Sequence, residues 1–191
     1  MSEKEHKKEA GKSSFSKVDT KKLFEIIDLT PGEKFLDVGC GRGEYSLAAA
    51  NYVGETGHLY AMDTWADGIN ILQEQSQVAG IQNIDAFVGN ISEGIPIEDS
   101  SIDKCLMANV LHGLGTEETG KNAIKEIKRV LKSPGEFIII EWKKVEGPHG
   151  PSLSIRLSPA DIEALLEPMG FKTKIVEDVG DNFYLIGLIE I

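Results

Sequence analysis

The chain alternates short apolar stretches with segments of helical periodicity, and this alternation restricts the folds that it can adopt. Strands are expected over residues 34–38, 58–62, 84–88, 102–108 and 136–142. Strands that alternate with helices pair in parallel, because each helix returns the chain to the same end of the sheet. The uninterrupted run Phe137-Ile138-Ile139-Ile140 indicates a strand buried on both faces, as at the centre of such a sheet.

Helix boundaries are marked by turn residues. A helix is expected over 66–79, with Ile69, Leu72 and Val78 facing inward and Gly80 as its C-cap. A second is expected over 116–131, ended by Ser133-Pro134-Gly135.

The C-terminal part departs from the alternation. Ser158-Pro159-Ala160-Asp161 begins a helix with an N-cap, a proline and an acid in the first turn. Strands over 171–178 and 183–189 then follow, and Gly180-Asp181-Asn182 between them indicates a hairpin. The sequence therefore predicts an α/β fold with a mostly parallel sheet and one antiparallel strand.

Length and composition favour one domain, over residues 17–191. Residues 1–16 are polar and rich in lysine and glutamate, which is typical of a disordered leader. The alternative is a lid over a ligand, with Phe15 as its apolar anchor.

The net charge of −11 disfavours nucleic acid and anionic membranes as partners. No apolar run approaches the ~20 residues of a membrane span. Only two cysteines occur, Cys40 and Cys105, both in apolar segments, so we expect a cytoplasmic protein without a disulfide framework or a metal site.

The segment that carries chemistry is the turn after the first strand, Asp37-Val38-Gly39-Cys40-Gly41-Arg42-Gly43. Glycines let a ligand approach the backbone, and ligands of such sheets bind at the carboxyl ends of the strands. Asp37 before the turn would repel a pyrophosphate but suits a cation. Asp63 closes the next strand ~20 residues beyond the last glycine, where an acid accepts hydrogen bonds from ribose hydroxyls.

Together the two acids describe an adenosine ligand without phosphates, which is S-adenosylmethionine. The alternatives are that Asp37 only caps N–H groups of the turn and that Asp63 only caps the next helix. Neither alternative explains both acids.

Residues 35–46, Asp63, the pair Asn90-Ile91 and the segment 130–135 resemble class I S-adenosylmethionine-dependent methyltransferases. The likeness is to the small-molecule branch that includes the quinone-biosynthesis C-methyltransferases. It implies a three-layer Rossmann-like fold with a seven-stranded sheet. It also implies a cofactor site made of Asp37, Gly39, Cys40, Gly41, Asp63, Thr64, Trp65, Asn90, Ile91 and Asn109.

By position, Gly39, Gly41 and Asn109 would lie at the methionine end of the donor, and Asn90 and Ile91 at adenine. Cys40 is expected to pack within the turn and not to act as a nucleophile, because its flanks are apolar.

Methyl transfer from a sulfonium mainly requires alignment of the reactants, so no catalytic triad is expected. If the small acceptor must lose a proton, the candidate bases are His112 and Glu141. Their alternatives are a partly buried loop histidine and a solvated carboxylate at a strand end.

Two other functions compete with methyl transfer. A nicotinamide-dependent oxidoreductase would have Gly-x-Gly-x-x-Gly, whereas Gly39, Gly41 and Gly43 lie two apart and Glu44 follows. A non-catalytic S-adenosylmethionine-binding module would keep the cofactor site and act through a protein partner.

Overall fold

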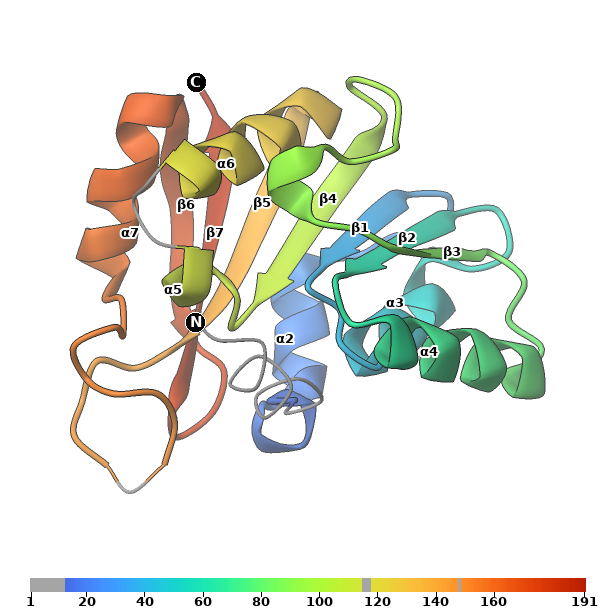
Figure 1. Cartoon of the computed structure of the whole chain (residues 1–191), viewed down its shortest axis with the longest axis horizontal. Coiled ribbons are helices and arrows are strands. Elements are labelled where there is room, and N and C mark those ends of the chain that lie inside the picture. The colour runs from blue at the N-terminus through green and yellow to red at the C-terminus, as the bar shows by residue number, and fades with distance from the viewer. Residues whose placement is uncertain (1–12, 115–117, 148) are drawn as a thin grey trace.

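The computed structural model describes residues 13–114, 118–147 and 149–191. Their strands form a seven-stranded sheet in the order β3-β2-β1-β4-β5-β7-β6 (Figure 1). The strands are β1 (Lys34–Val38), β2 (His58–Asp63), β3 (Ile84–Val88), β4 (Ile102–Ala108), β5 (Leu131–Trp142), β6 (Phe171–Asp178) and β7 (Phe183–Glu190). Strands β1 to β5 pair in parallel, and β7 is antiparallel to both β5 and β6. The predicted fold class is confirmed.

Helices cover both faces of the sheet and give the molecule three layers (Figure 1). One face packs against α2 (Thr20–Ile27), α3 (Glu44–Val53) and α4 (Ala66–Ala79). The other packs against α5 (Leu111–Leu114), α6 (Glu118–Val130) and α7 (Pro159–Leu166). Short 3-10 helices lie at η1 (Phe15–Lys17), η2 (Ile91–Glu93) and η3 (Glu167–Met169). No described helix is both long and apolar enough to cross a bilayer.

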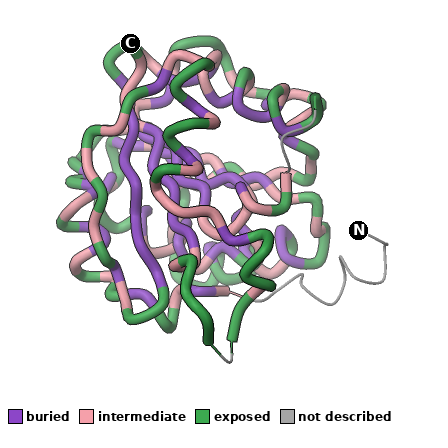
Figure 2. Tube along the Cα trace, turned by 90° about the vertical axis from the view of Figure 1, so that its left-hand side faces the viewer, coloured by how far each residue is buried: buried purple, intermediate pink, exposed green. Residues whose placement is uncertain are grey.

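The central strand β5 shows why an uninterrupted apolar run occurs in this chain. Phe137 and Ile139 point into the core beneath α6, whereas Ile138 and Ile140 point into the core beneath α3. All four are at most 2% exposed, and Figure 2 shows the strands as the buried interior. A strand between two helical layers needs an apolar side chain at every position.

The predicted helix starts and stops are mostly confirmed. Ser158 and Asp161 form a reciprocal capping box at the start of α7, and Gly80 ends α4 in the left-handed conformation. The hairpin joining β6 and β7 is also present.

The boundary between α6 and β5 differs from the expectation. The helix ends at Val130, and β5 begins at Leu131, five residues earlier than the expected start at Glu136. Leu131 is 4% exposed and pairs with Ile102, so burial against the sheet outweighs its helical spacing. The register shift between Ile102 and Lys104 accommodates Ser133-Pro134-Gly135 within the strand. The expected helix start at Thr116 lies outside the described residues.

The expected inward position of Val78 is wrong, because this side chain is 90% exposed. Ser76 takes the inward position and donates its hydroxyl to the Leu72 carbonyl at 2.8 Å. At ~100° per residue, Ser76 lies one turn from Leu72, whereas Val78 points away from that stripe.

Leu72 and Val78 allow a matched stability test on one helix. Leu72 is fully buried, so Leu72→Ala should lower the free energy of unfolding by about 2–5 kcal/mol. Val78→Ala should change it by no more than about 0.5 kcal/mol. Urea denaturation of the three proteins measures both values, and equal losses would contradict the orientation of α4.

Candidate active site

The glycine turn lies where β1 ends, at the centre of the carboxyl edge of the sheet, between β2 and β4. Gly39, Gly41 and Gly43 have φ of 71°, 58° and 79°, the region that favours glycine. A Cβ on Gly39 would lie 2.3 Å from Val110 Cγ2, and one on Gly43 would lie 2.4 Å from Leu72 Cδ1. Nothing lies within 4 Å of the Cβ position of Gly41. The outer glycines are therefore needed for packing, and the middle one opens onto space that a ligand can enter.

Asp63 joins the turn to the loop after β2. Its Oδ2 accepts the Gly41 N–H at 2.7 Å, and its Oδ1 accepts the Trp65 N–H at 2.8 Å. The N-cap of α4 is Trp65, so Asp63 does not itself cap that helix. Each carboxylate oxygen has a second lone pair, so this bracing leaves Asp63 able to accept hydroxyl donors. Thr64, between Asp63 and Trp65, is exposed.

Asp37 lies beneath the turn and is 1% exposed. Its Oδ2 accepts the Ser46 hydroxyl of α3 at 2.5 Å. The carboxyl also accepts a hydrogen bond from the Ser46 backbone N–H in the first turn of α3, so Asp37 does cap an N–H group after the glycines, a role that is compatible with cofactor binding. Burial, with a smaller contribution from the charge of Asp63, raises the pKa of the Asp37 carboxyl from 3.8 to about 7, against the lowering effect of the hydrogen bonds from Ser46.

Cys40 is 8% exposed within the turn. Burial raises the pKa of its thiol well above the ordinary value, with the charges of Asp37 and Asp63 adding to the effect. A thiol held in the protonated form is a poor nucleophile, so this supports a packing role.

Asn109 follows β4 and has a φ of 58°, a left-handed conformation that asparagine tolerates. Its Nδ2 donates to Ser14 Oγ at 2.6 Å, and Ser14 Oγ shares a hydrogen bond of 2.8 Å with the Tyr45 hydroxyl. Asn109 Oδ1 is buried and has no hydrogen-bond partner within the described residues. This oxygen can accept a hydrogen bond from a ligand at the turn.

Phe15 packs edge-on against Tyr45 at 5.1 Å between ring centroids, so residues 14 and 15 lie over the start of α3. No sequence motif marks Ser14 or Tyr45 as site residues, and Ser14 belongs to a polar segment without periodicity. The expected leader or lid otherwise falls on residues 1–12, which lie outside the described residues.

Asn90 and Ile91 follow β3. Asn90 is exposed and caps η2 by accepting the Ser92 N–H at 3.1 Å. Ile91 is 6% exposed and belongs to the core beneath α6. Both therefore lie at the carboxyl edge, with Asn90 the more accessible of the two.

His112 and Glu141, at the ends of neighbouring segments, come into direct contact. The Nδ1 of His112 lies 2.8 Å from Glu141 Oε2 and 3.0 Å from Oε1. Glu141 is fully buried, so the alternative of a solvated carboxylate is wrong. The two candidates form one unit, which their separation of 29 residues did not indicate.

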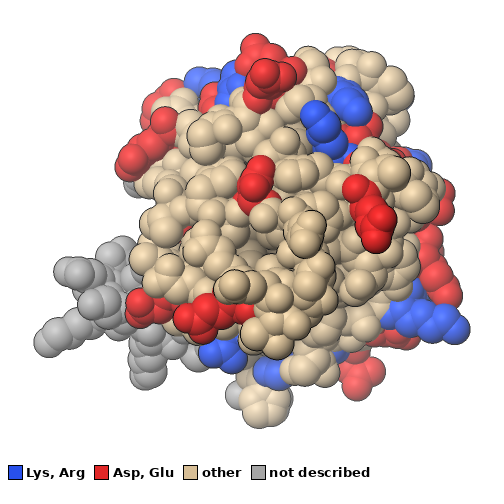
Figure 3. All heavy atoms as spheres, turned by 90° about the vertical axis from the view of Figure 1, so that its right-hand side faces the viewer, with Lys and Arg blue, Asp and Glu red and all other residues tan. Residues whose placement is uncertain are grey.

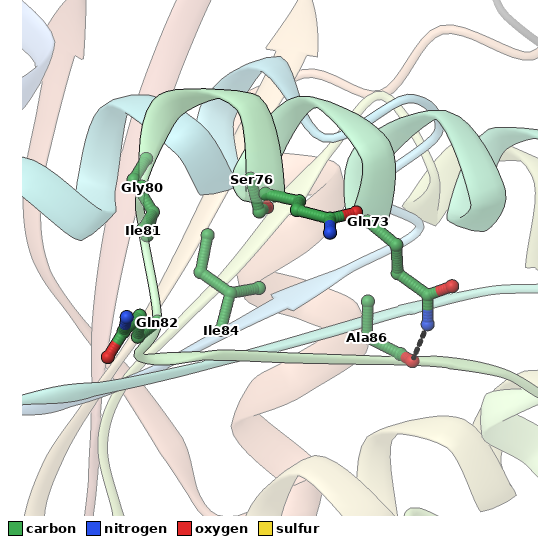
Figure 4. A pocket seen from close by; sticks show the side chains of 8 residues that line it. Gln73, Ser76, Gly80, Ile81, Gln82, Ile84 and Ala86 are labelled. Atoms are coloured by element: carbon green, nitrogen blue, oxygen red, sulfur yellow. Dashed lines mark hydrogen bonds between the residues drawn. The ribbon is translucent and has the colours of Figure 1, made fainter.

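Other features of the described part add no chemistry. A hollow of about 290 Å³ lies between α4 and β3, away from the glycine turn (Figure 4). Amide, hydroxyl and apolar groups line it, and Gln73 Nε2 donates there to the Ala86 carbonyl at 3.1 Å.

On the face that carries α4 and β3, acids are spread among uncharged side chains and most basic groups lie toward the margins (Figure 3). Within the described ranges, no three His, Cys, Asp or Glu side chains gather around a possible metal position.

The strand order, the open glycine turn and the acid that closes β2 define a class of protein. They are the architecture of the class I S-adenosylmethionine-dependent methyltransferases, the class predicted from the sequence. The family described as a methyltransferase domain matches residues 29–164. The chain belongs to that family.

Similar proteins support this assignment. A solved S-adenosylmethionine-dependent methyltransferase from Aquifex aeolicus is 28% identical, with a TM-score of 0.86 and complete coverage of both chains. A demethylmenaquinone methyltransferase from Bacillus cytotoxicus is 31% identical over 121 residues, 63% of this chain and 49% of that protein. The chain thus spans about half the length of the curated relatives it matches. A geranyl diphosphate C-methyltransferase from Streptomyces coelicolor, 13% identical with a TM-score of 0.68 over 90% of this chain and 80% of that one, shares the fold.

Asp37 provides a test of the electrostatics of the site. Its folded pKa of about 7 lies above the ordinary value of 3.8, so between these pH values only the folded state keeps the proton. The unfolding free energy of the wild type should therefore fall relative to that of Asp37→Asn, by about 1.4 kcal/mol per pH unit from about pH 4 to about pH 7.

Denaturation of both proteins across this range measures the difference between them. A difference that stays constant with pH would show that Asp37 titrates normally. Asp181→Asn, which removes an exposed carboxylate in the turn between β6 and β7, serves as the control.

Proposed function

We propose that this protein transfers a methyl group from S-adenosylmethionine to a small organic acceptor. The observation that carries the proposal is the pair of carboxyls, Asp37 and Asp63, at an open glycine turn. Two acids at this place oppose a pyrophosphate and favour a cationic nucleoside. The spacing of the glycines and the position of Asp37 also count against a nicotinamide cofactor.

The residues at the turn fit S-adenosylmethionine. The open space at Gly41 admits a ligand against the backbone. Asn109 Oδ1, which has no hydrogen-bond partner in the part of the chain that the structure describes, offers an acceptor for an ammonium group. A positive charge beside Asp37 favours its ionised form, which compensates part of the cost of burying it. When bound, the donor supplies an electrophilic methyl group on a sulfonium.

The protein's task is then to hold and align. Asp63 accepts the ribose hydroxyls through the lone pairs that Gly41 and Trp65 leave open. Thr64 and Trp65 flank the adenosine, and Asn90 with Ile91 marks the adenine end. The methionine part of the donor lies against Gly39, Cys40 and Gly41. Alignment of this kind contributes about 7–11 kcal/mol to lowering a bimolecular barrier.

The acceptor side is assigned to His112 and Glu141. Because relatives carry the name demethylmenaquinone methyltransferase, reduced naphthoquinones are the first acceptors to assay. The acidic net charge argues against nucleic acid as the acceptor. Both cysteines are free and buried, which suits a protein located in the reducing cytoplasm. We also propose that residues 17–191 form the single catalytic domain.

Asp63→Ala tests the cofactor assignment. Loss of charge-assisted hydrogen bonds, each worth roughly 1.5–3 kcal/mol, should weaken S-adenosylhomocysteine binding at least tenfold. Calorimetric titration of the full chain measures the affinity, and Asp85→Ala, which removes an equal charge from an exposed position, should leave it unchanged.

Unchanged affinity in Asp63→Ala would remove this residue from the site. Binding of NADH in place of S-adenosylhomocysteine by the wild type would overturn the proposed function. Tight binding with no methyl transfer to any acceptor would favour the non-catalytic module.

A further inference from the structure

Glu141 is held as a hydrogen-bond acceptor on every side that the structure describes. Its Oε1 accepts the backbone N–H of His112 at 3.1 Å, and its Oε2 accepts the backbone N–H of Trp142 at 3.3 Å. Tyr184, its partner on β7, directs its hydroxyl to the Leu157 carbonyl at 2.7 Å. Glu141 is thus the acceptor in both backbone hydrogen bonds, and the Tyr184 hydroxyl donates elsewhere. In the short contact with His112, the imidazole Nδ1–H is therefore the donor and Glu141 is again the acceptor.

This hydrogen bond selects one tautomer of His112. With the proton on Nδ1, the neutral ring carries its lone pair on Nε2. The Nε2 atom makes no hydrogen bond within the described residues, and the side chain keeps 15% of its surface exposed. The ring is thus oriented by a buried carboxylate and presents a basic nitrogen outward.

The ring lies on the segment that touches the glycine turn. Val110, two residues before His112, packs at Gly39, and the Asn109 N–H donates to the Ile140 carbonyl at 2.8 Å. The dyad therefore follows directly after residues that contact the methionine end of the proposed donor site. A base is useful there only for a nucleophile that holds a proton.

We propose that His112 is the general base of the transfer and that Glu141 is the positioning residue that sets its tautomer. The acceptor is then an aromatic or enolic hydroxyl compound. This inference rests on the proposed function and narrows the class of its substrate.

The hydroxyl proton of the acceptor moves to Nε2, and the resulting imidazolium is stabilised by the Glu141 carboxylate. The acceptor oxygen forms a bond to the methyl carbon while the methyl–sulfur bond breaks, and its electron pair stays on sulfur. The imidazolium afterwards releases its proton to water. For transfer to a ring carbon conjugated with the oxygen, that carbon forms the bond to the methyl group instead; its hydrogen then leaves as a proton to water, and the imidazolium returns a proton to the oxygen.

A purely structural role would make different predictions. Glu141 also accepts the backbone N–H of His112, so the dyad could act only to attach α5 to β5. His112→Asn separates the two roles, because the Asn amide can still donate to Glu141 but has no atom in place of Nε2. Glu141→Gln keeps the size of the side chain and removes its charge.

The tautomer is measured by nitrogen-15 NMR of the histidine rings in the full chain with S-adenosylhomocysteine added, with His112→Asn to assign the signals. We expect protonated Nδ1 and unprotonated Nε2 for neutral His112, and a mixture of tautomers in Glu141→Gln. A proton on Nε2 in the wild type, or an unchanged tautomer in Glu141→Gln, would overturn the proposal whether or not an acceptor is turned over.

The acceptor class is tested with 1,4-dihydroxynaphthalene and with 1-naphthols made stepwise more acidic by halogen and nitro groups. For the least acidic member, His112→Asn should lower kcat roughly 10²- to 10⁴-fold, with S-adenosylhomocysteine affinity unchanged. The defect should shrink below about tenfold for naphthols already ionised at the assay pH.

A defect of equal size across the series, or no defect, would overturn the base assignment. A wild type that binds S-adenosylhomocysteine but methylates none of these compounds would overturn the hydroxyl acceptor class. A wild type that does not bind S-adenosylhomocysteine would instead overturn the proposed function, so the two failures are distinguishable.

Discussion

The bond on which the site depends is that between the Asp63 carboxylate and the Gly41 N–H. Parallel strands place the ends of β1 and β2 side by side, but they do not fix the loops that follow them. One carboxylate joins both loops, and the left-handed glycines give the turn the shape that this bond needs. Packing of Val110 and Leu72 against the outer glycines then leaves the middle one open.

Charge divides the site into two sides. On one side, the carboxyls of Asp37 and Asp63 lie beneath and beside the turn, where burial and the charge of Asp63 disfavour ionisation of Asp37, and a cationic ligand would relieve this cost. On the other, Glu141 is matched by the N–H groups of His112 and Trp142 within the protein. When the ligand compensates the cost of burying a carboxylate, as at Asp37, ligand binding is favoured. When N–H groups of the protein compensate it, as at Glu141, the side chain is held in a fixed geometry.

Local patterns were sufficient to predict most of the fold. The apolar run in β5, the capping box of α7 and the hairpin before β7 each depend on a few neighbouring residues. Where tertiary packing decides, the pattern was misleading: Leu131 leaves its helical face for the sheet, and Val78 points to solvent.

The same distinction applies to the site. The turn and the positions of both acids follow from motifs, whereas Ser14 against Asn109 and His112 against Glu141 are contacts between distant segments. No spacing rule encodes such contacts, because the fold alone brings them together. The sequence motifs therefore indicate the candidate residues one by one, and the fold brings them into contact.

The placement of β7 between β5 and β6 has a consequence for how the molecule is made. This strand is synthesised after the six others, yet it pairs along its length with two of them. Until β7 leaves the ribosome, β5, the strand that carries Glu141, presents an edge without its β7 partner. A nascent chain with the whole glycine turn already formed would still lack the support of its acceptor side, so binding of the acceptor should require β7 to have been synthesised.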